Sequence, residues 1–126
     1  MKNTWEQHGS DIWIYHTRKR SVGDNLTCPS YISQEDFDVA DSIAGTWVIT
    51  YDGVGKLPYV YNPHSGIYLH RAIMKKIYGE KQIKDYVVDH LDGNRLNNRR
   101  SNLRLLTDAQ NLSQSRMKID RPIGRS

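Results

Sequence analysis

The alternation of hydrophobic and polar residues predicts helices and strands mainly after residue 30. Ser33–Gly45 (SQEDFDVADSIAG) is typical of a short helix, with a serine cap, acidic residues in its first turn and a terminal glycine. Thr46–Tyr51 (TWVITY) alternates and is rich in strand-forming residues, and Tyr59–Tyr61 is expected to pair with it. Residues 1–30 mix apolar side chains with glycine and proline, and they predict no clear element.

The second half of the chain predicts a helix, two short strands and a final helix. Leu69–Tyr78 (LHRAIMKKIY) places its apolar residues on one face of a helix, which is the pattern of an amphipathic helix packed on a core. Tyr86–Val88 and Leu103–Thr107 predict two short strands. Thr107 and Gln110 have the spacing of a capping box, which predicts that a helix begins there.

Composition indicates one small folded domain. The chain has 126 residues, of which 37% are hydrophobic and 10% aromatic, enough for a modest core. No apolar run approaches the roughly 20 residues of a membrane span, and the chain does not open with a signal-peptide pattern. The single cysteine, Cys28, excludes an internal disulfide and a multi-cysteine zinc site. We therefore expect an intracellular, cytoplasmic protein without a membrane partner.

Charge is distributed unevenly along the sequence. Residues 1–65 hold 5 Lys or Arg and 8 Asp or Glu, whereas residues 66–126 hold 13 and 6. A basic half in a chain with a net charge of +4 suggests a polyanionic partner such as DNA. Many basic domains are simply soluble and bind no polyanion, so this pattern does not decide the function by itself.

The segment between the two predicted short strands carries the candidate chemistry. Asp89 and His90 close the first strand, and residues 91–102 form a loop too long for an ordinary hairpin. Adjacent side chains on a strand point to opposite faces, so both residues can serve one site only if the backbone bends there. The final helix is expected to stack over the hairpin and bring Asn111 toward Asp89.

These residue types suit metal-assisted hydrolysis of a phosphodiester. An Asp carboxylate and an Asn carbonyl are hard oxygen ligands that suit Mg²⁺, and a neighbouring His is a competent general base. Arginines around the loop supply charge for phosphate. The candidate DNA-contacting residues are the loop and strand residues Arg95, Arg99, Arg100 and Arg104, Arg71 and Lys75 on the polar face of the 69–78 helix, and Gln114 and Lys118 on the face shared with Asn111.

The run DHLDGNRLNNRRSNLRLLTDAQN resembles the HNH nuclease family with the ββα-metal fold. It is most similar to the zinc-free branch found in phage and intron-encoded homing endonucleases. In that branch an Asp-His pair is followed by an Asp-Gly-Asn turn, an Asn-Asn pair, Ser-Asn-Leu-Arg and an Asn on the helix. The resemblance is strong from Val87 to Asn111 and weaker back to Leu69.

The resemblance implies a role for each motif residue. His90 corresponds to the general base, Asp89 to a metal ligand, and Asn102 to the residue that ties the loop across the hairpin and orients His90. Asn111 occupies the third motif position as a metal ligand, where many family members have histidine. The amide favours Mg²⁺ or Mn²⁺ over softer ions, and no structural zinc is expected.

Together these observations predict a small α+β domain with an N-terminal β-hairpin and helix followed by a ββα-metal motif. Residues 1–45 are expected to form an extension, 46–119 the nuclease domain with its core at 86–119, and 120–126 a tail. The expected function is a metal-dependent DNA endonuclease acting on double-stranded DNA, as a monomer or homodimer, in a phage or bacterial setting. A catalytically inactive DNA-binding module and a structural domain with a fortuitous motif remain alternatives.

Some residues have a simpler structural interpretation. His70 lies beside apolar residues on the helical wheel, so a buried or hydrogen-bonded structural histidine is favoured over a ligand. Asn94, Asn97 and Asn98 are expected to shape the loop, because asparagine tolerates tight turns and caps backbone groups.

Overall fold

The computed structural model describes residues 1–18, 26–52 and 56–111. Its N-terminal strands β1 (Trp5–His8), β2 (Asp11–Arg18) and β3 (Leu26–Ser33) form an antiparallel meander. The sequence predicted no clear element here, because β3 contains Pro29 and β1 is exposed along its whole length. Strand β2 nevertheless alternates between a buried face, with Ile12 and Ile14, and a more exposed face.

The predicted helix after residue 33 forms in a shorter version. A 3-10 turn, Gln34–Asp36, leads into α1 (Phe37–Ser42). Ser33 does not cap this turn with its side chain, contrary to expectation, because its Oγ accepts a hydrogen bond from the backbone N–H of Arg100. The predicted hairpin is present as β4 (Val48–Asp52) and β5 (Leu57–Asn62), which pair antiparallel and are followed by β6 (Ile67–Tyr68) on the other edge of β5.

The predicted amphipathic helix is confirmed as α2 (Leu69–Tyr78), which buries Leu69, His70, Ile73 and Met74. Gly79 ends it with a φ of 88° and donates its N–H to the carbonyl of Lys75 at 2.8 Å, which is the role of a C-terminal glycine. A short helix α3 (Glu80–Ile83) follows. Strands β7 (Val87–His90) and β9 (Leu103–Leu106) then pair antiparallel, with Val87 opposite Leu106 and His90 opposite Leu103.

The capping box that opens the final helix is present. The backbone N–H of Thr107 donates to Gln110 Oε1 at 2.9 Å, and the N–H of Gln110 donates to Thr107 Oγ1 at 3.2 Å. Two unpaired helical N–H groups are satisfied in this way. Asn111 donates its N–H to the Thr107 carbonyl at 2.9 Å, which places it in the first turn as predicted.

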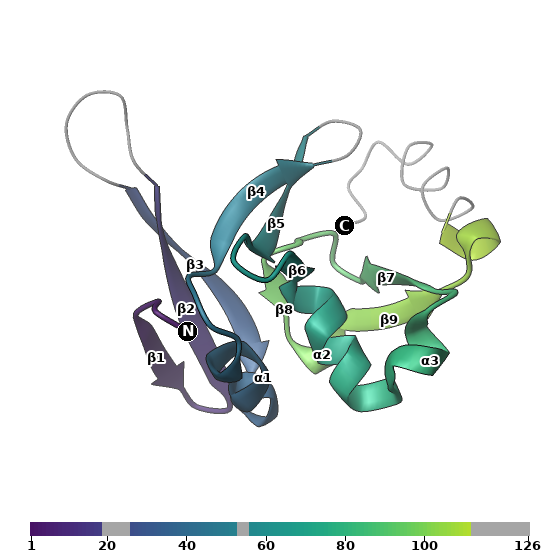
Figure 1. The fold of residues 1–126 in the computed structure, drawn as a ribbon, viewed down its shortest axis with the longest axis horizontal. Helices are drawn as coiled ribbons and strands as arrows, with labels where there is room; N and C mark the ends of the chain where they lie inside the picture. Colours follow the sequence, from purple (N-terminus) through teal and green to yellow (C-terminus); the bar gives the residue numbers. More distant parts are fainter. Residues whose placement is uncertain (19–25, 53–55, 112–126) are drawn as a thin grey trace.

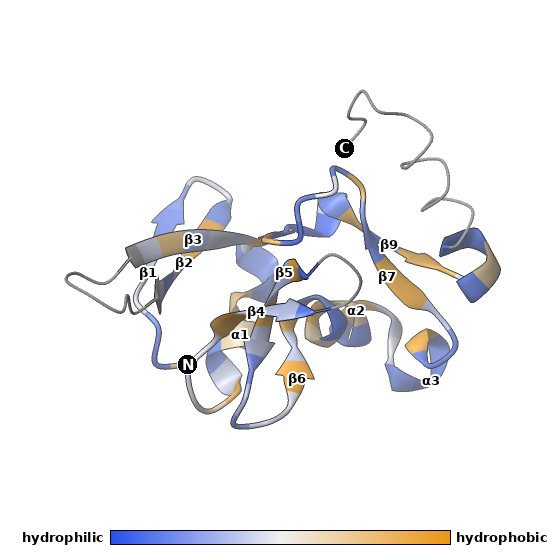
Figure 2. Ribbon diagram, turned by 90° about the horizontal axis from the view of Figure 1, so that it is seen from above, coloured by the Kyte–Doolittle hydropathy of each residue, from blue (hydrophilic) through white to orange (hydrophobic). Residues whose placement is uncertain are grey.

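One hydrophobic core joins the two halves of the sequence. It includes Ile14 and Ile32 from the N-terminal sheet, Ile73 from α2, and Val88 and Leu103 from the β7–β9 pair. Figure 2 shows the apolar stretches of the paired strands β7 and β9. Trp47, fully buried, belongs to the same core.

The loop between β7 and β9 is tied directly to the N-terminal sheet. Its central residues form β8 (Asn97–Asn98), which pairs in parallel with β3, Tyr31 opposite Asn97 and Ile32 opposite Asn98. In Figure 1 β8 lies between the N-terminal sheet and the β7–β9 pair. Among the described residues, no helix is long and apolar enough to cross a membrane.

Candidate active site around His90

Asp89 and His90 lie within the β7 ladder and point to opposite faces of it. Asp89 is opposite Arg104, and His90 is opposite Leu103, so the strand continues through both residues. The expected bend at this dipeptide is therefore wrong. Residues directly opposite in an antiparallel pair share a face, which explains why Arg104 Nε donates to Asp89 Oδ2 at 3.0 Å. Both Asp89 and His90 are buried.

Asn98 fixes the ring of His90. His90 Nε2 lies 2.7 Å from Asn98 Oδ1, and both side chains are buried. An amide oxygen only accepts hydrogen bonds, so Nε2 carries the proton and Nδ1 is left with a free lone pair. Burial lowers the pKa of His90, the Asn98 hydrogen bond raises it in part, and the charge of Arg95 lowers it again. His90 is thus held neutral, in the form that can accept a proton.

Asn102 organises the loop without touching His90. Its Nδ2 donates to Asp92 Oδ1 at 2.9 Å and to the carbonyl of Asn97 at 2.8 Å, while its Oδ1 accepts the Asp92 N–H at 3.0 Å. The expected tie across the loop is present. The expected orientation of His90 by Asn102 is wrong, because the bond to the ring comes from Asn98.

Asp92 is a second residue of this loop on which several hydrogen bonds converge. Burial opposes its ionisation, but hydrogen bonds from Asn97, the backbone of Asn94 and Asn102 outweigh that effect and lower the pKa of Asp92. The carboxylate therefore stays charged and gathers the loop amides around it. Asn94 also accepts the N–H of Leu96 at 3.0 Å with its Oδ1, which is the turn-shaping role predicted for it.

His70 packs edge-on against His90. The ring centroids are 5.4 Å apart with an interplanar angle of 70°, and Tyr59 and Tyr68 lie against the other sides of His70. Burial, together with the nearby charges, lowers the pKa of His70 to about 3. His70 Nδ1 is buried and has no hydrogen-bond partner within the described parts of the chain. The predicted buried position is confirmed, but the hydrogen bond of a structural histidine is not seen.

Arg95 is held beside Tyr59, whose ring also contacts His70. Its Nε donates to Tyr59 Oη at 3.1 Å, one terminal nitrogen donates to the Gly93 carbonyl at 3.1 Å, and its guanidinium lies 5.6 Å from the Tyr59 ring centre. Its charge acts on the pKa values of both His70 and His90. Arg95 is half-buried and presents a fixed positive charge beside the site.

The next two loop arginines bind carboxylates of the N-terminal residues. Arg99 contacts Asp11 at 2.8 Å and lies 4.8 Å from the Tyr31 ring centre. Arg100 makes a two-point contact with Asp36, through Nε and a terminal nitrogen at 2.8 Å each. These contacts give both side chains partners within the protein, so their predicted contact with DNA stays a prediction that the geometry does not favour.

The helix residues chosen as DNA contacts also have protein partners. Arg71 donates to the carbonyls of Ile83 and Tyr86, both at 3.1 Å, and so ties α2 to the segment that leads into β7. Lys75 lies 3.6 Å from Glu80, with both side chains exposed. Gln114 and Lys118 lie outside the described residues.

The predicted metal ligands offer two hard oxygens, which fits Mg²⁺ in kind. Asp89 already shares Oδ2 with Arg104, whose half-buried side chain is 38% exposed and can turn away without disturbing the core. That Asn111 joins Asp89 in one metal site stays a prediction. Among the described residues no three His, Cys, Asp or Glu side chains are grouped to hold a metal.

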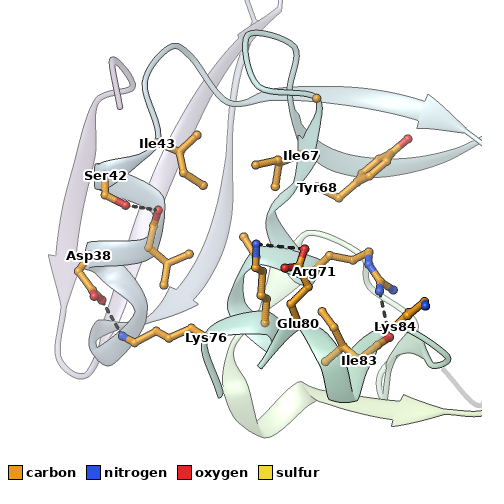
Figure 3. A pocket seen from close by; sticks show the side chains of 14 residues that line it. Asp38, Ser42, Ile43, Ile67, Tyr68, Arg71, Lys76, Glu80, Ile83 and Lys84 are labelled. Carbon is orange, nitrogen blue, oxygen red and sulfur yellow. Dashed lines mark hydrogen bonds and ion pairs between the residues drawn. The ribbon is translucent and has the colours of Figure 1, made fainter. Parts of the chain in front are cut away.

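A cavity of about 820 Å³ lies elsewhere, between α1, β6, α2 and α3 (Figure 3). Its walls include Ile43, Ile67 and Ile83, flanked by the Lys75–Glu80 and Lys76–Asp38 pairs. Neither Asp89 nor His90 lines it. Four of its ionic side chains pair with one another, and because neither Asp89 nor His90 is part of its lining, the cavity does not extend the candidate active site.

Comparison with protein families gave one match, to a family described as HNH endonuclease, over residues 67–113. Residues 67–113 are thus similar to the HNH endonuclease family. The match confirms the family that the Asp-His and Asn-Asn motifs predicted, and it fits the observed mixture of helices and strands. No curated protein and no solved structure matched the chain.

The HNH segment begins at β6 and includes His70, Asp89, His90, Asn98 and Asn111. The N-terminal sheet lies outside the matched range, although β3 pairs with β8 inside it. Sequence reasoning missed the contact of Asn98 with His90. The adjacent asparagines give no sign of which one faces the ring, and only the parallel pairing with β3 decides it.

Proposed function

We propose that this chain is a metal-dependent DNA endonuclease that hydrolyses phosphodiester bonds and nicks one strand at each active site. The observation that carries the proposal is the state of His90. It is buried, neutral and held through Nε2 by Asn98, with Nδ1 left as a proton acceptor. The HNH match over the same residues supports the reaction class and DNA as the substrate.

In the proposed reaction, His90 Nδ1 accepts a proton from a water molecule as the water oxygen forms a bond to phosphorus. The bond from phosphorus to the 3′ oxygen breaks, and that oxygen takes a proton from solvent. The products carry a 5′-phosphate and a 3′-hydroxyl. Asn98 keeps the Nε2 proton in place, so the ring presents the same lone pair in every cycle.

Asp89 and Asn111 are the residues that would hold the divalent metal, Mg²⁺ or Mn²⁺. When bound, such an ion neutralises phosphate charge and stabilises the leaving oxygen. Asp89 is buried next to His90 in β7, where its partner Arg104 contributes charge. The two side chains point to opposite faces of the strand, so their joint action on one phosphodiester requires the end of β7, next to the turn at Leu91, to bend when DNA and the metal bind. Arg95, fixed against Tyr59 near both histidines, is the arginine best placed to bind the phosphate.

Cleavage of supercoiled plasmid tests the proposal. We expect the purified protein with Mg²⁺ or Mn²⁺ to produce open-circular DNA, and EDTA to stop the reaction. His90→Ala should abolish nicking, whereas His64→Ala is the matched control, because His64 lies in an exposed turn. If supercoiled DNA survives with either metal, or if His90→Ala cuts as well as the unmodified protein, the nuclease proposal is wrong.

The same preparation distinguishes the alternative of an inactive DNA-binding module. In that case DNA binding would be seen and would weaken with salt, while no open-circular product would form at any metal concentration. The contact between Asn98 and His90 supports the enzyme, because it fixes one ring nitrogen of His90 as a proton acceptor, which the binding of DNA alone does not require.

A further inference from the structure

Asp36 is a fully buried carboxylate at the end of the 3-10 turn that precedes α1. Its two oxygens receive Nε and a terminal nitrogen of Arg100, both at 2.8 Å, and Lys76 lies 3.7 Å away. Such two-point contacts fix the position of both partners as well as their separation. The pair joins residues that are 64 positions apart in the sequence, one from the N-terminal half and one from the HNH loop.

Arg100 follows Asn98 by two residues, and other contacts attach this stretch to the same N-terminal elements. The Arg100 backbone N–H donates to Ser33 Oγ at 3.0 Å, and the Tyr31 N–H donates to the Leu96 carbonyl at 2.9 Å. Between these bonds, β8 pairs with β3, with Ile32 opposite Asn98. The backbone that carries Asn98 is thus held from both sides by residues 31–36.

An ion pair that is buried on one side contributes little net stability, because removing the charges from water costs about as much as their attraction returns. What such a pair does supply is a defined geometry. Here the position of Arg100 affects His90 through Asn98, two residues earlier, because Asn98 Oδ1 accepts the Nε2 proton of His90 at 2.7 Å. The N-terminal residues therefore support the active-site loop rather than merely preceding it.

We propose that Asp36 is a positioning residue for His90. Through Arg100 it sets the position of β8, and through Asn98 on β8 it sets the orientation of the His90 ring. This inference rests on the proposed function of His90 as a base, and it gives residues 1–45 a role in catalysis. It also explains why an acidic N-terminal half accompanies a basic HNH segment: part of the basic charge binds within the protein.

The test compares Asp36→Asn with Asp38→Asn. Both variants lose one negative charge from neighbouring positions, and both remove a partner of Lys76, but Asp38 does not contact Arg100. Misplacing a catalytic group by about 1 Å costs on the order of 100-fold in rate. We expect Asp36→Asn to lower kcat for a DNA duplex by about 10- to 100-fold with KM unchanged, and Asp38→Asn to keep both values.

A second measurement follows the ring of His90 itself. In the unmodified protein, ¹⁵N NMR should show His90 with its proton on Nε2, and Asp36→Asn should change that signal while Asp38→Asn leaves it unchanged. This measurement remains informative if the protein does not cleave DNA, so failure of the nuclease proposal can be distinguished from failure of this one.

A folded Asp36→Asn protein with the kcat of the unmodified protein, or with an unchanged His90 signal, overturns the inference. An equal loss of kcat in both variants also overturns it, because a general loss of stability would then be the cause. If Asp36→Asn does not fold, Arg100→Lys is measured in the same way. It keeps the charge but removes the two-point contact, and it should lower kcat at constant KM.

Discussion

Replacing Asn98 with alanine removes the hydrogen bond that holds the neutral ring of His90. The backbone of residue 98 keeps its pairing with Ile32, so β8 has no reason to separate from β3. The Nε2 proton of His90 loses its acceptor in a buried position, and the ring becomes free to exchange its proton between the two nitrogens. Only the form with a free Nδ1 serves the proposed reaction.

The size of the effect follows from the strength of one hydrogen bond. A neutral buried hydrogen bond contributes about 0.5–1.5 kcal/mol net, which corresponds to a population change of up to about tenfold. Added rotational freedom of the ring raises the expected loss of kcat to between about 10- and 100-fold. Stability should fall by less than about 2 kcal/mol, because Asn98 Nδ2 is itself buried without a partner in the described structure and its removal offsets part of the loss.

Single-turnover cleavage of a duplex with excess enzyme measures the rate, and urea unfolding measures the stability. Asn94→Ala is the control, since Asn94 lies in the same loop but its side chain accepts the Leu96 N–H instead of contacting His90. We expect the control to cleave within about twofold of the unmodified protein, because it leaves the bond to the base in place. Equal rates for Asn98→Ala and the unmodified protein would refute the assignment of Asn98 as the partner of the base.

Three further predictions follow from other contacts. The folded-state pKa of His70, about 3, is below its usual value, so lowering the pH from 6.5 protonates the unfolded chain first and stability falls. The free energy of unfolding should fall by about 2 kcal/mol between pH 8 and pH 5. His70→Phe should remove this part of the pH dependence when unfolding in urea is measured at both pH values, and an equal fall in the variant would contradict the prediction. Thr107→Ala should cost about 1 kcal/mol through the lost capping box, with Asp108→Ala as the comparison. Asp89→Asn should abolish metal-dependent nicking, and normal cleavage by that variant would exclude Asp89 as a ligand.

The basic residues of the second half have partners in the folded protein that the charge pattern of the sequence did not predict. Arg99 and Arg100 were predicted to face phosphate, but they pair with Asp11 and Asp36 from the acidic half. The distribution of charge along a sequence does not show which oppositely charged residues contact each other in the folded chain. Arg95, bound to Tyr59 beside the histidines, remains the loop arginine that the geometry favours for DNA.

Local patterns in the sequence predicted the elements of the second half and the family that residues 67–113 match. The helix at residues 69–78, the capping box at Thr107 and the two short strands follow from periodicity and capping, which depend on near neighbours. The Asp-His pair and the asparagines after it predicted the HNH family. These features were readable because each depends on residues within about one turn or one hairpin of each other.

Only the tertiary structure decided which asparagine holds His90 and what the first 45 residues contribute. Asn98 reaches the ring because β8 pairs in parallel with β3, and Arg100 is fixed by Asp36, 64 residues earlier. A parallel pairing between distant segments leaves no periodic signal in either strand, particularly when one of them is two residues long. His90 could therefore be chosen as the candidate base from its neighbours in sequence, whereas the orientation of its ring depends on contacts that exist only in the folded chain.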